Sequence, residues 1–301
     1  MSNFTQHRWQ MLSLPDIDQL LKIALHEDVR TVGDLTCLAL IPETAQGTAS
    51  IAARTNGTLA GIPLIQKILS IVDARLVWEG RLADSAQFTR GESIGTISGP
   101  ARGLLIAERP VLNFLGRLSG IATLTKRYVD AIQGTHSQIY DTRKTTPGWR
   151  QLEKYAVVCG GGQNHRAGLY DAVLIKDNHL ALGRQVTKPF SPAEAVVRAK
   201  EFLRERFSDS LPIVEVEVDT LEQLREVLPA GPDIVLLDNM PPSHLLQSVG
   251  IRNSVNPGIQ LEASGGITLA TVRSIAETGV ERISVGELTH SAVSLDFGLD
   301  W

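Results

Sequence analysis

Short apolar runs rich in β-branched residues recur along the second half of the chain, and each one ends at a polar or charged group. After residue 120 they read QIYDTRK, DAVLIKDN, PIVEVEVDT, DIVLLDN, IQLEASGG and RISVGEL. Segments with helical periodicity, such as LEQLREVL and TLATVRSIAETG, separate most of these runs. This alternation of strand and helix predicts parallel βα units.

The polar residues at the ends of the runs favour one kind of α/β fold. They are Arg143, Lys144, Lys176, Glu217, Asp238, Ser264 and Gly286. In an α/β barrel the carboxyl ends of all strands meet on one face, where the chemistry is collected. An open doubly wound sheet would instead focus a site at one switch point. We therefore predict an α/β barrel over residues 120–287.

The pattern before residue 120 differs and indicates a separate domain over residues 1–119. An amphipathic helix is expected from Ile17 to about His26, and short strands are expected at 47–53, 58–60, 74–78 and 93–97. A long helix begins near Ala101, and Pro110 inside it predicts a break or kink. Residues 288–301 follow the barrel and are expected to return to the N-terminal domain.

Charge and composition exclude several classes of function. The formal net charge is -4, whereas a protein that tracks nucleic acid normally carries a basic excess over a whole face. Cys37 and Cys159 are far apart, so neither a disulfide framework nor a CxxC motif can be drawn. The start, MSNFTQHRWQ, lacks the apolar run of a signal peptide, and no stretch predicts a membrane span. We expect a cytoplasmic protein with neither nucleic-acid nor membrane partners.

Strong cations are concentrated in one stretch, between Asp141 and His179. The stretch contains DTRKTTPGW, GGQNHRAGL and LIKDNH. A focused positive pocket in an acidic protein indicates a small anionic substrate.

The ordered motifs DTRKTTPGW, NHRAGLYDAVLIKDNH, VEVEVDT, LLDN, LEASGGI and ISVGELTHS resemble those of one enzyme family. EDVRTVGDLT and GLLIAERPVLNFLGRLSGIAT extend the likeness over nearly the whole chain. The family is nicotinate-nucleotide pyrophosphorylase (carboxylating), also called quinolinate phosphoribosyltransferase. The resemblance implies an N-terminal α/β sandwich domain, an incomplete α/β barrel of the seven-stranded type, and a homodimer with shared sites, with higher oligomers left open.

The resemblance also implies an activity in NAD biosynthesis. A phosphoribosyl group would pass from phosphoribosyl pyrophosphate to quinolinate with Mg²⁺, giving nicotinate mononucleotide, pyrophosphate and CO₂. Lys144, Glu217 and Asp238 would be catalytic, and the last two would hold Mg²⁺, partly through substrate and water. The implied substrate-binding residues, besides these three, are Arg109 (from the partner subunit), Thr142, Arg143, His165, Arg166, Lys176, Ser264, Gly265, Gly266, Ser284, Val285 and Gly286.

The chemistry of this reaction accounts for such a residue set. Quinolinate is a dicarboxylate and the donor carries a phosphate and a pyrophosphate, so guanidinium groups can bind them through charge-assisted bonds. Cleavage of the bond between ribose and pyrophosphate develops positive charge on the sugar, which carboxylates near it stabilise. Late strand loops with glycines, such as SGG, provide backbone N–H groups for the 5′-phosphate.

Several other residues have structural interpretations. Residues 160–162 are expected to form a helix C-terminal turn rather than a phosphate loop. His179 is expected to bond locally near Asp177, and Asp34 to cap a helix or turn. Glu215 shares a strand face with Glu217 and could either support it from deeper in the barrel or form a structural pair.

Two alternative functions remain open. One is a Schiff-base lyase on the same barrel, with Lys144 or Lys176 as the nucleophile. The other is a divergent relative, such as the ModD-like proteins associated with molybdenum transport. The complete set of cations argues against both, and an assay distinguishes them.

Overall fold

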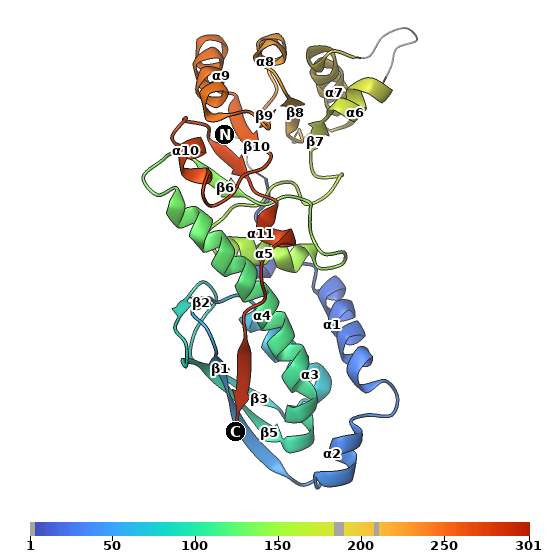
Figure 1. The fold of residues 1–301 in the computed structure, drawn as a ribbon. Helices are drawn as coiled ribbons and strands as arrows, with labels where there is room; N and C mark the ends of the chain where they lie inside the picture. The colour runs from blue at the N-terminus through green and yellow to red at the C-terminus, as the bar shows by residue number, and fades with distance from the viewer. Residues whose placement is uncertain (1–3, 184–189, 208–210) are drawn as a thin grey trace. The chain divides into compact units, whose positions relative to one another are not determined.

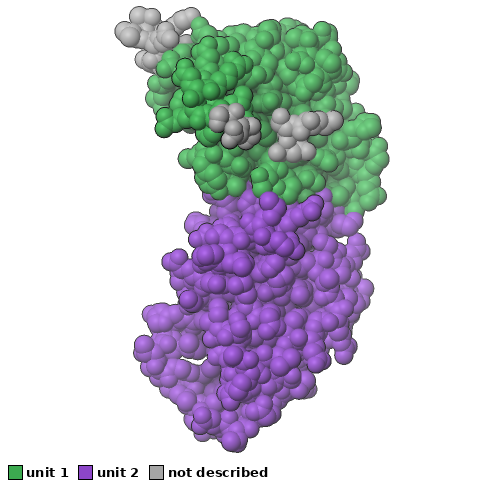
Figure 2. Space-filling model, turned by 180° about the vertical axis from the view of Figure 1, so that it is seen from behind, with its two compact units in different colours: residues 1–6, 127–144, 162–287 green, residues 7–126, 145–161, 288–301 purple. Residues whose placement is uncertain are grey.

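The computed structural model describes residues 4–183, 190–207 and 211–301. They form two compact units, coloured separately in Figure 2. The first unit takes the residues up to Gln6 together with 127–144 and 162–287, and the second takes 7–126, 145–161 and 288–301. This division is more interleaved than the one predicted from the sequence, which had boundaries only at 119/120 and at 287/288; the return of residues 288–301 to the N-terminal unit agrees with that prediction.

A parallel sheet forms the centre of the first unit, with strand order β6-β11-β10-β9-β8-β7. The strands are β6 (Gln138–Tyr140), β7 (Val173–Ile175), β8 (Val214–Val218), β9 (Ile234–Asp238), β10 (Gln260–Ser264) and β11 (Arg282–Ser284). Every pairing in this sheet is parallel. All six apolar runs read from the sequence therefore form strands, and the prediction of parallel βα units is confirmed.

A single parallel bridge between Tyr140 and Gln163 adds one more strand position beside β6. Gln163 N–H donates to the Ile139 carbonyl at 2.7 Å, and Asp141 N–H donates to the Gln163 carbonyl at 3.1 Å. Among the described residues the sheet does not close, because its order ends at β6 and β7. The predicted class, an incomplete α/β barrel with a separate α/β domain, is confirmed.

Helices connect the strands of the first unit. They are α6 (Asp177–Leu182), α7 (Pro192–Arg206), α8 (Leu221–Val227), the 3₁₀ helix η2 (Leu228–Ala230), α9 (Pro242–Val255) and α10 (Val272–Ala276). Capping boxes start two of them: Ser191 accepts from Glu194 N–H, and Thr220 accepts from Gln223 N–H. Helices α7, α8 and α9 lie along one side of the strands (Figure 1). The buried residues of α7 and α8 are apolar, whereas α9 buries Leu245 together with Ser248 and Arg252.

An antiparallel sheet forms the centre of the second unit, with order β12-β1-β5-β3. Its strands are β1 (Gln46–Ala53), β3 (Val77–Gly80), β5 (Ser93–Pro100) and β12 (Phe297–Asp300), and β2 (Gly57–Thr58) pairs with β4 (Gln87–Phe88). The helices are η1 (Trp9–Met11, 3₁₀), α1 (Leu14–Val29), α2 (Leu35–Leu40), α3 (Ile62–Val72), α5 (Arg150–Cys159) and most of α4 (Ala101–Ala131) and α11 (Glu287–His290), of which 127–131 and 287 belong to the first unit. Strand β12 lies beside β1 (Figure 1) and brings the last residues onto the N-terminal sheet.

Helix α4 continues through Pro110, so of the predicted break or kink the break does not occur. Proline removes one backbone hydrogen bond and crowds the preceding turn. The helix buries Leu104, Ala107, Val111 and Leu115. Burial of this apolar stripe favours the continuous helix and offsets the cost of the proline.

Candidate active site

The parallel pairing in the first unit places the carboxyl ends of its strands along one edge. Asp238 and Ser264 are direct partners at the ends of β9 and β10, and Ser284 is the partner of Tyr140. Lys176 directly follows β7, and Glu217 is the penultimate residue of β8. The structure therefore brings together predicted residues from β7, β8, β9, β10 and β11, at the edge where α/β barrels carry chemistry.

Lys176 and Glu217 form an ion pair between neighbouring strand ends. The side chain of Glu217 is 13% exposed, and that of Lys176 is 37% exposed. Burial raises the pKa of Glu217 above its usual value, the hydrogen bond and charge of Lys176 lower it, and the charge of Asp238 raises it. Glu217 thus lies between a cation and a second carboxylate.

The acidic pair Glu217 and Asp238 fits a magnesium ion that is shared with substrate. The side-chain amide of Asn239 donates to Asp238 Oδ2 at 2.7 Å, which leaves Asp238 Oδ1 for another ligand. Magnesium is commonly bound through one or two carboxylates together with substrate phosphates, and it retains several waters. Two neighbouring carboxylates at the edge of the sheet meet that requirement.

Arg143 and Arg166 lie near each other despite their like charges. Arg166 is 6% exposed, and its Nη1 donates to the Ala172 carbonyl at 3.1 Å. Burial lowers the pKa of Arg166, and the charge of Arg143 lowers it further. Among the described residues, the buried Nε of Arg143 has no hydrogen-bond partner. An anion between two such groups would relieve the repulsion and form charge-assisted bonds.

Asp141 joins the two cationic motifs. It is fully buried, and its carboxylate accepts the side-chain amide of Asn164 at 2.7 Å and the backbone N–H of His165 at 2.8 Å. Next to it, Thr142 Oγ1 accepts the Lys144 N–H at 3.1 Å. The DTRK and NHR motifs are thus held together through one carboxylate.

His165 lies deeper than the other predicted binding residues. It is 5% exposed, and its Nε2 is 2.9 Å from Glu215 Oε2 and 3.5 Å from Glu262 Oε1. Burial lowers the pKa of His165, but the two carboxylates outweigh burial and raise it. Of the two roles expected for Glu215, support of Glu217 or a structural pairing, this contact with His165 agrees with the pairing.

Sequence reasoning missed three residues of this deeper layer: Glu262, Arg282 and Phe4. Glu262 and Arg282 form a fully buried ion pair with an Nε to Oε2 distance of 2.7 Å. The Phe4 ring stacks on His165 with centroids 4.5 Å apart. A charged residue inside the apolar runs IQLEAS and RISVG was the available signal for the ion pair, because buried charges are rare unless paired. Nothing local in the sequence marks Phe4.

The SGG segment has the backbone expected of a phosphate cradle. Gly265 and Gly266 have φ values of 93° and 58°, which favour glycine. A Cβ on Gly265 would lie 2.2 Å from Asn239 Oδ1, while Asn239 N–H donates to the Ser264 carbonyl at 2.9 Å. Both glycines are exposed. The assignment of their backbone N–H groups to a substrate phosphate stays a prediction.

The second half of the predicted cradle is less accessible. Ser284 and Val285 are 5% and 1% exposed. The Val285 N–H donates to the Tyr140 carbonyl at 2.9 Å, so this backbone group is already engaged in the sheet. Ser284 hydrogen-bonds Glu262 in the deeper layer. Gly286, which follows them, is half-buried.

Arg109 belongs to the second unit. It lies on α4, its side chain is 68% exposed, and Nη2 is 3.2 Å from Glu108 Oε1. Its assignment to the site of a partner subunit stays a prediction.

The residues given structural interpretations behave as expected. Asp34 caps α2 by accepting the N–H groups of Thr36 and Cys37 at 2.9 and 3.0 Å. Helix α5 ends at Cys159, and Gly161 has a φ of 86° in the turn that follows. His179 Nδ1 accepts the Lys176 N–H at 3.0 Å. These interpretations are confirmed.

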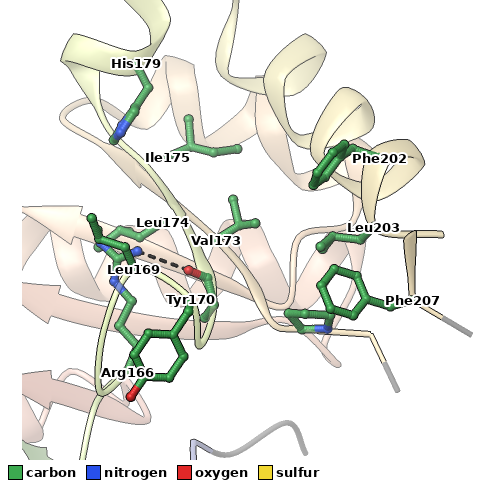
Figure 3. A pocket seen from close by; sticks show the side chains of 12 residues that line it. Arg166, Leu169, Tyr170, Val173, Leu174, Ile175, His179, Phe202, Leu203 and Phe207 are labelled. Carbon is green, nitrogen blue, oxygen red and sulfur yellow. Dashed lines mark hydrogen bonds between the residues drawn. The ribbon is translucent and has the colours of Figure 1, made fainter. Parts of the chain in front are cut away.

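A pocket of about 420 Å³ lies beside β7, and its lining includes Arg166 and His179. Figure 3 shows Phe202, Leu203 and Phe207 on one side of it and Leu169 and Tyr170 on the other. The hydrogen bond from Arg166 to the Ala172 carbonyl lies at the edge of this pocket. Its lining is mainly apolar, which suits neither a dicarboxylate nor a pyrophosphate.

Comparison with known proteins covers both units. Residues 34–119 match the N-terminal domain and residues 121–300 the C-terminal domain of quinolinate phosphoribosyl transferase. Nicotinate-nucleotide pyrophosphorylase (carboxylating) of Mycobacterium leprae is 42% identical over 284 residues, covering 93% of this chain and 95% of that protein. Quinolinate phosphoribosyltransferase (decarboxylating) 2b of Nicotiana tabacum is 40% identical over 300 residues, with coverages of 94% and 82%.

A solved structure agrees with these relatives. The nicotinate-nucleotide pyrophosphorylase of Francisella tularensis is 35% identical, covers 99% of both chains and superposes with a TM-score of 0.89. The motif order, the two matched domains and the fold lead to one conclusion. This chain belongs to the quinolinate phosphoribosyltransferase family.

Proposed function

We propose that this protein transfers a phosphoribosyl group from phosphoribosyl pyrophosphate to quinolinate and releases CO₂, giving nicotinate mononucleotide for NAD biosynthesis. The observation that carries the proposal is the presence of two groups in one parallel sheet unit: Arg143 and Arg166, which influence each other's charge, and Lys176, Glu217 and Asp238 at the ends of β7, β8 and β9. Such a site matches a dicarboxylate acceptor and a donor that develops positive charge at its sugar.

The cations bind and orient the acceptor. Arg143 and Arg166 pair with the carboxylates of quinolinate, and Lys176 adds a further charge-assisted bond. Lys144 lies between quinolinate and the donor, and Arg109 of a partner subunit completes the enclosure. Orientation of the pyridine nitrogen toward the anomeric carbon makes the attack effectively unimolecular.

The acidic residues act on the sugar. Glu217 and Asp238 stabilise the positive charge that develops as the bond between ribose and pyrophosphate breaks. Mg²⁺, when bound with the donor, neutralises charge on the leaving pyrophosphate. Gly265 and Gly266 bind the 5′-phosphate through their backbone N–H groups.

Decarboxylation follows from the product of the transfer step. Once the ring nitrogen carries the ribosyl group, the pyridinium accepts the electron pair left when CO₂ departs from the adjacent carbon. A proton then takes the position of the lost carboxylate. The protein holds the ring and excludes competing geometries.

The deciding experiment incubates the protein with quinolinate, phosphoribosyl pyrophosphate and Mg²⁺ and measures nicotinate mononucleotide and CO₂ together. We expect both products in equal amounts, and loss of both when EDTA removes the metal. No donor-dependent product would contradict the proposal, and equal activity on nicotinic acid would contradict its specificity. Trapping of a substrate adduct with borohydride would favour the lyase alternative.

On the basis of the same family membership, we also propose that the protein is a homodimer with shared active sites. We propose that it uses Mg²⁺ and that it is located in the cytoplasm. In the described part of the chain, no helix has the length and apolar character needed to cross a bilayer. Sedimentation of the purified protein measures the oligomeric state.

A further inference from the structure

A charged cluster lies inside the first unit, one layer below the strand ends. Glu215, Glu262 and Arg282 are fully buried, and His165 is 5% exposed. Residues two apart on a strand share a face. The cluster therefore lies on the same face as the residues that follow two positions later on β8, β10 and β11: Glu217, Ser264 and Ser284.

The hydrogen bonds of His165 define the position of its ring hydrogen. Nδ1 accepts the backbone N–H of Arg166 at 2.8 Å, so Nδ1 carries no hydrogen itself. The hydrogen is then on Nε2, which faces Glu215 at 2.9 Å and Glu262 at 3.5 Å. The carboxylates favour a proton at Nε2, while the Arg166 N–H disfavours a second one at Nδ1.

The charges of the cluster balance without a further cation. Arg282 Nε donates to Glu262 Oε2 at 2.7 Å, and its guanidinium lies 3.6 Å from the Tyr140 ring centroid and 5.0 Å from that of Phe4. Glu215 interacts favourably with the charge of Arg166. The two carboxylate charges are thus matched in number by two guanidinium charges, one in direct contact with Glu262 and one acting on Glu215 through its charge.

A metal ion is the competing interpretation of the same groups. The ligand atoms of His165, Glu215 and Glu262 all lie within 4.8 Å of one another. A metal would have to replace the Nε2 hydrogen and would add positive charge beside Arg282, which already pairs with Glu262. The geometry therefore favours an ion-paired, hydrogen-bonded cluster.

We infer that Glu215 and Glu262 are positioning residues: they hold the His165 imidazole with its hydrogen on Nε2, so that Nδ1 fixes the Arg166 backbone and directs its guanidinium toward the acceptor carboxylates. His165 acts through Arg166 in this arrangement, since both of its ring nitrogens face groups of the protein. The inference rests on the proposed function, because it takes quinolinate as the anion that Arg166 binds.

The test compares Glu215→Gln and Glu262→Gln with Glu281→Gln. Glu281 lies in the same unit and is also ion-paired, with Arg252 Nη2 at 2.7 Å, and it accepts the Leu261 N–H at 2.9 Å. Its loss removes a comparable ion pair that none of the contacts above connects to His165. For each protein, kcat, both KM values, the unfolding temperature and the ¹⁵N NMR shifts of the His165 ring are measured, with the signal assigned by its absence in His165→Asn.

We expect the KM for quinolinate to rise on the order of tenfold in both cluster variants. The KM for phosphoribosyl pyrophosphate should change by less than about threefold. The wild-type NMR shifts should be those of the Nε2–H tautomer, and the variants should lose that preference. Glu281→Gln should lower the unfolding temperature and leave the quinolinate KM and the tautomer unchanged.

Two results would overturn the inference while the proposed function stands. In the first, the wild-type protein is active and the Glu215→Gln and Glu262→Gln variants have the same KM for quinolinate as the wild type. The other is a quinolinate KM that rises equally in Glu281→Gln, since the effect would then follow stability alone. If the wild-type protein does not convert quinolinate, the proposed function is wrong, and so is the role of Arg166 in binding quinolinate. The NMR shifts would still show whether the two carboxylates fix the tautomer of His165.

Discussion

Lys176 and Glu217 form an ion pair where the parallel strands β7 and β8 end side by side. Burial and the negative charge of Asp238 both raise the pKa of Glu217 and favour its protonated form. The positive charge of Lys176 lowers this pKa and so acts against both effects. Lys176 therefore favours the ionised form of Glu217, which the proposed function requires near the sugar.

Lys176→Met should move the acid limb of the pH profile of kcat/KM to higher pH. The pKa of Glu217 is raised by burial, and Lys176 lowers it. Without Lys176 the pKa rises further, so the active ionised form is lost sooner as the pH falls. Arg225→Met, which removes a surface ion pair with Glu222 at 3.9 Å, is the control and should leave the limb in place. An unmoved limb in Lys176→Met would contradict this coupling.

Asp141→Asn should weaken both the fold and the site. Asp141 accepts hydrogen bonds from Asn164 and from the His165 backbone in a fully buried position. We expect a loss of about 1–3 kcal/mol in unfolding free energy and a decrease in kcat/KM on the order of tenfold. Urea unfolding and steady-state kinetics measure the two effects.

Asp233→Asn is the matched control for this change. Asp233 accepts the Val214 N–H at 2.8 Å near the start of β8, at the end of the strand away from the site. The Asp233→Asn variant should have a lower free energy of unfolding and the same kcat and KM values as the wild type. Equal kinetic losses in both variants would show that Asp141 contributes only to stability.

His165→Asn should retain more quinolinate affinity than His165→Ala. The Asn side-chain oxygen can accept the Arg166 N–H as Nδ1 does, whereas Ala offers no acceptor. Both variants remove the contacts to Glu215 and Glu262, so their difference isolates the bond to Arg166. Equal KM values for quinolinate in the two variants would rule out a role for that bond.

The strand ends were predictable because one rule governs them. Each apolar run stops where its strand leaves the buried sheet, so a polar residue at that point lies on the carboxyl edge. Lys176, Glu217 and Asp238 were read from the sequence in this way, and the structure places all three on that edge. Local capping was equally readable at Asp34, because its side chain bonds only two and three residues ahead.

The deeper layer could not be predicted in full, since it depends on contacts between distant parts of the chain. Phe4 stacks on His165, and Arg282 extends over both Phe4 and Tyr140. No local pattern specifies such partners. Pro110 failed as a helix breaker for a related reason, because the tertiary burial of α4 outweighs a local preference.

Gly120→Ala should destabilise the second unit, although alanine favours helices. A Cβ at this position in α4 would lie 2.1 Å from the Val293 carbonyl oxygen, a backbone atom that cannot move alone. We expect a loss of about 1–3 kcal/mol, measured by thermal unfolding. Gly250→Ala is the control: it lies on α9 with no atom within 4 Å of the added Cβ, and it should stabilise by about 0.5–1 kcal/mol. A stabilising Gly120→Ala would contradict the close approach.

Arg109→Ala and Lys144→Ala should each be nearly inactive alone and should recover activity when mixed. If Arg109 acts in the site of a partner subunit, a hybrid dimer contains one site with both residues intact. Random exchange between equal amounts of two variants places about half of the dimers in the hybrid form, so activity should approach about a quarter of the wild-type value. Arg109 is 68% exposed on α4, as a residue that reaches a partner must be before assembly. Subunit exchange is verified with differently tagged chains, and absence of recovery after proven exchange would place Arg109 and Lys144 in the same site of one chain.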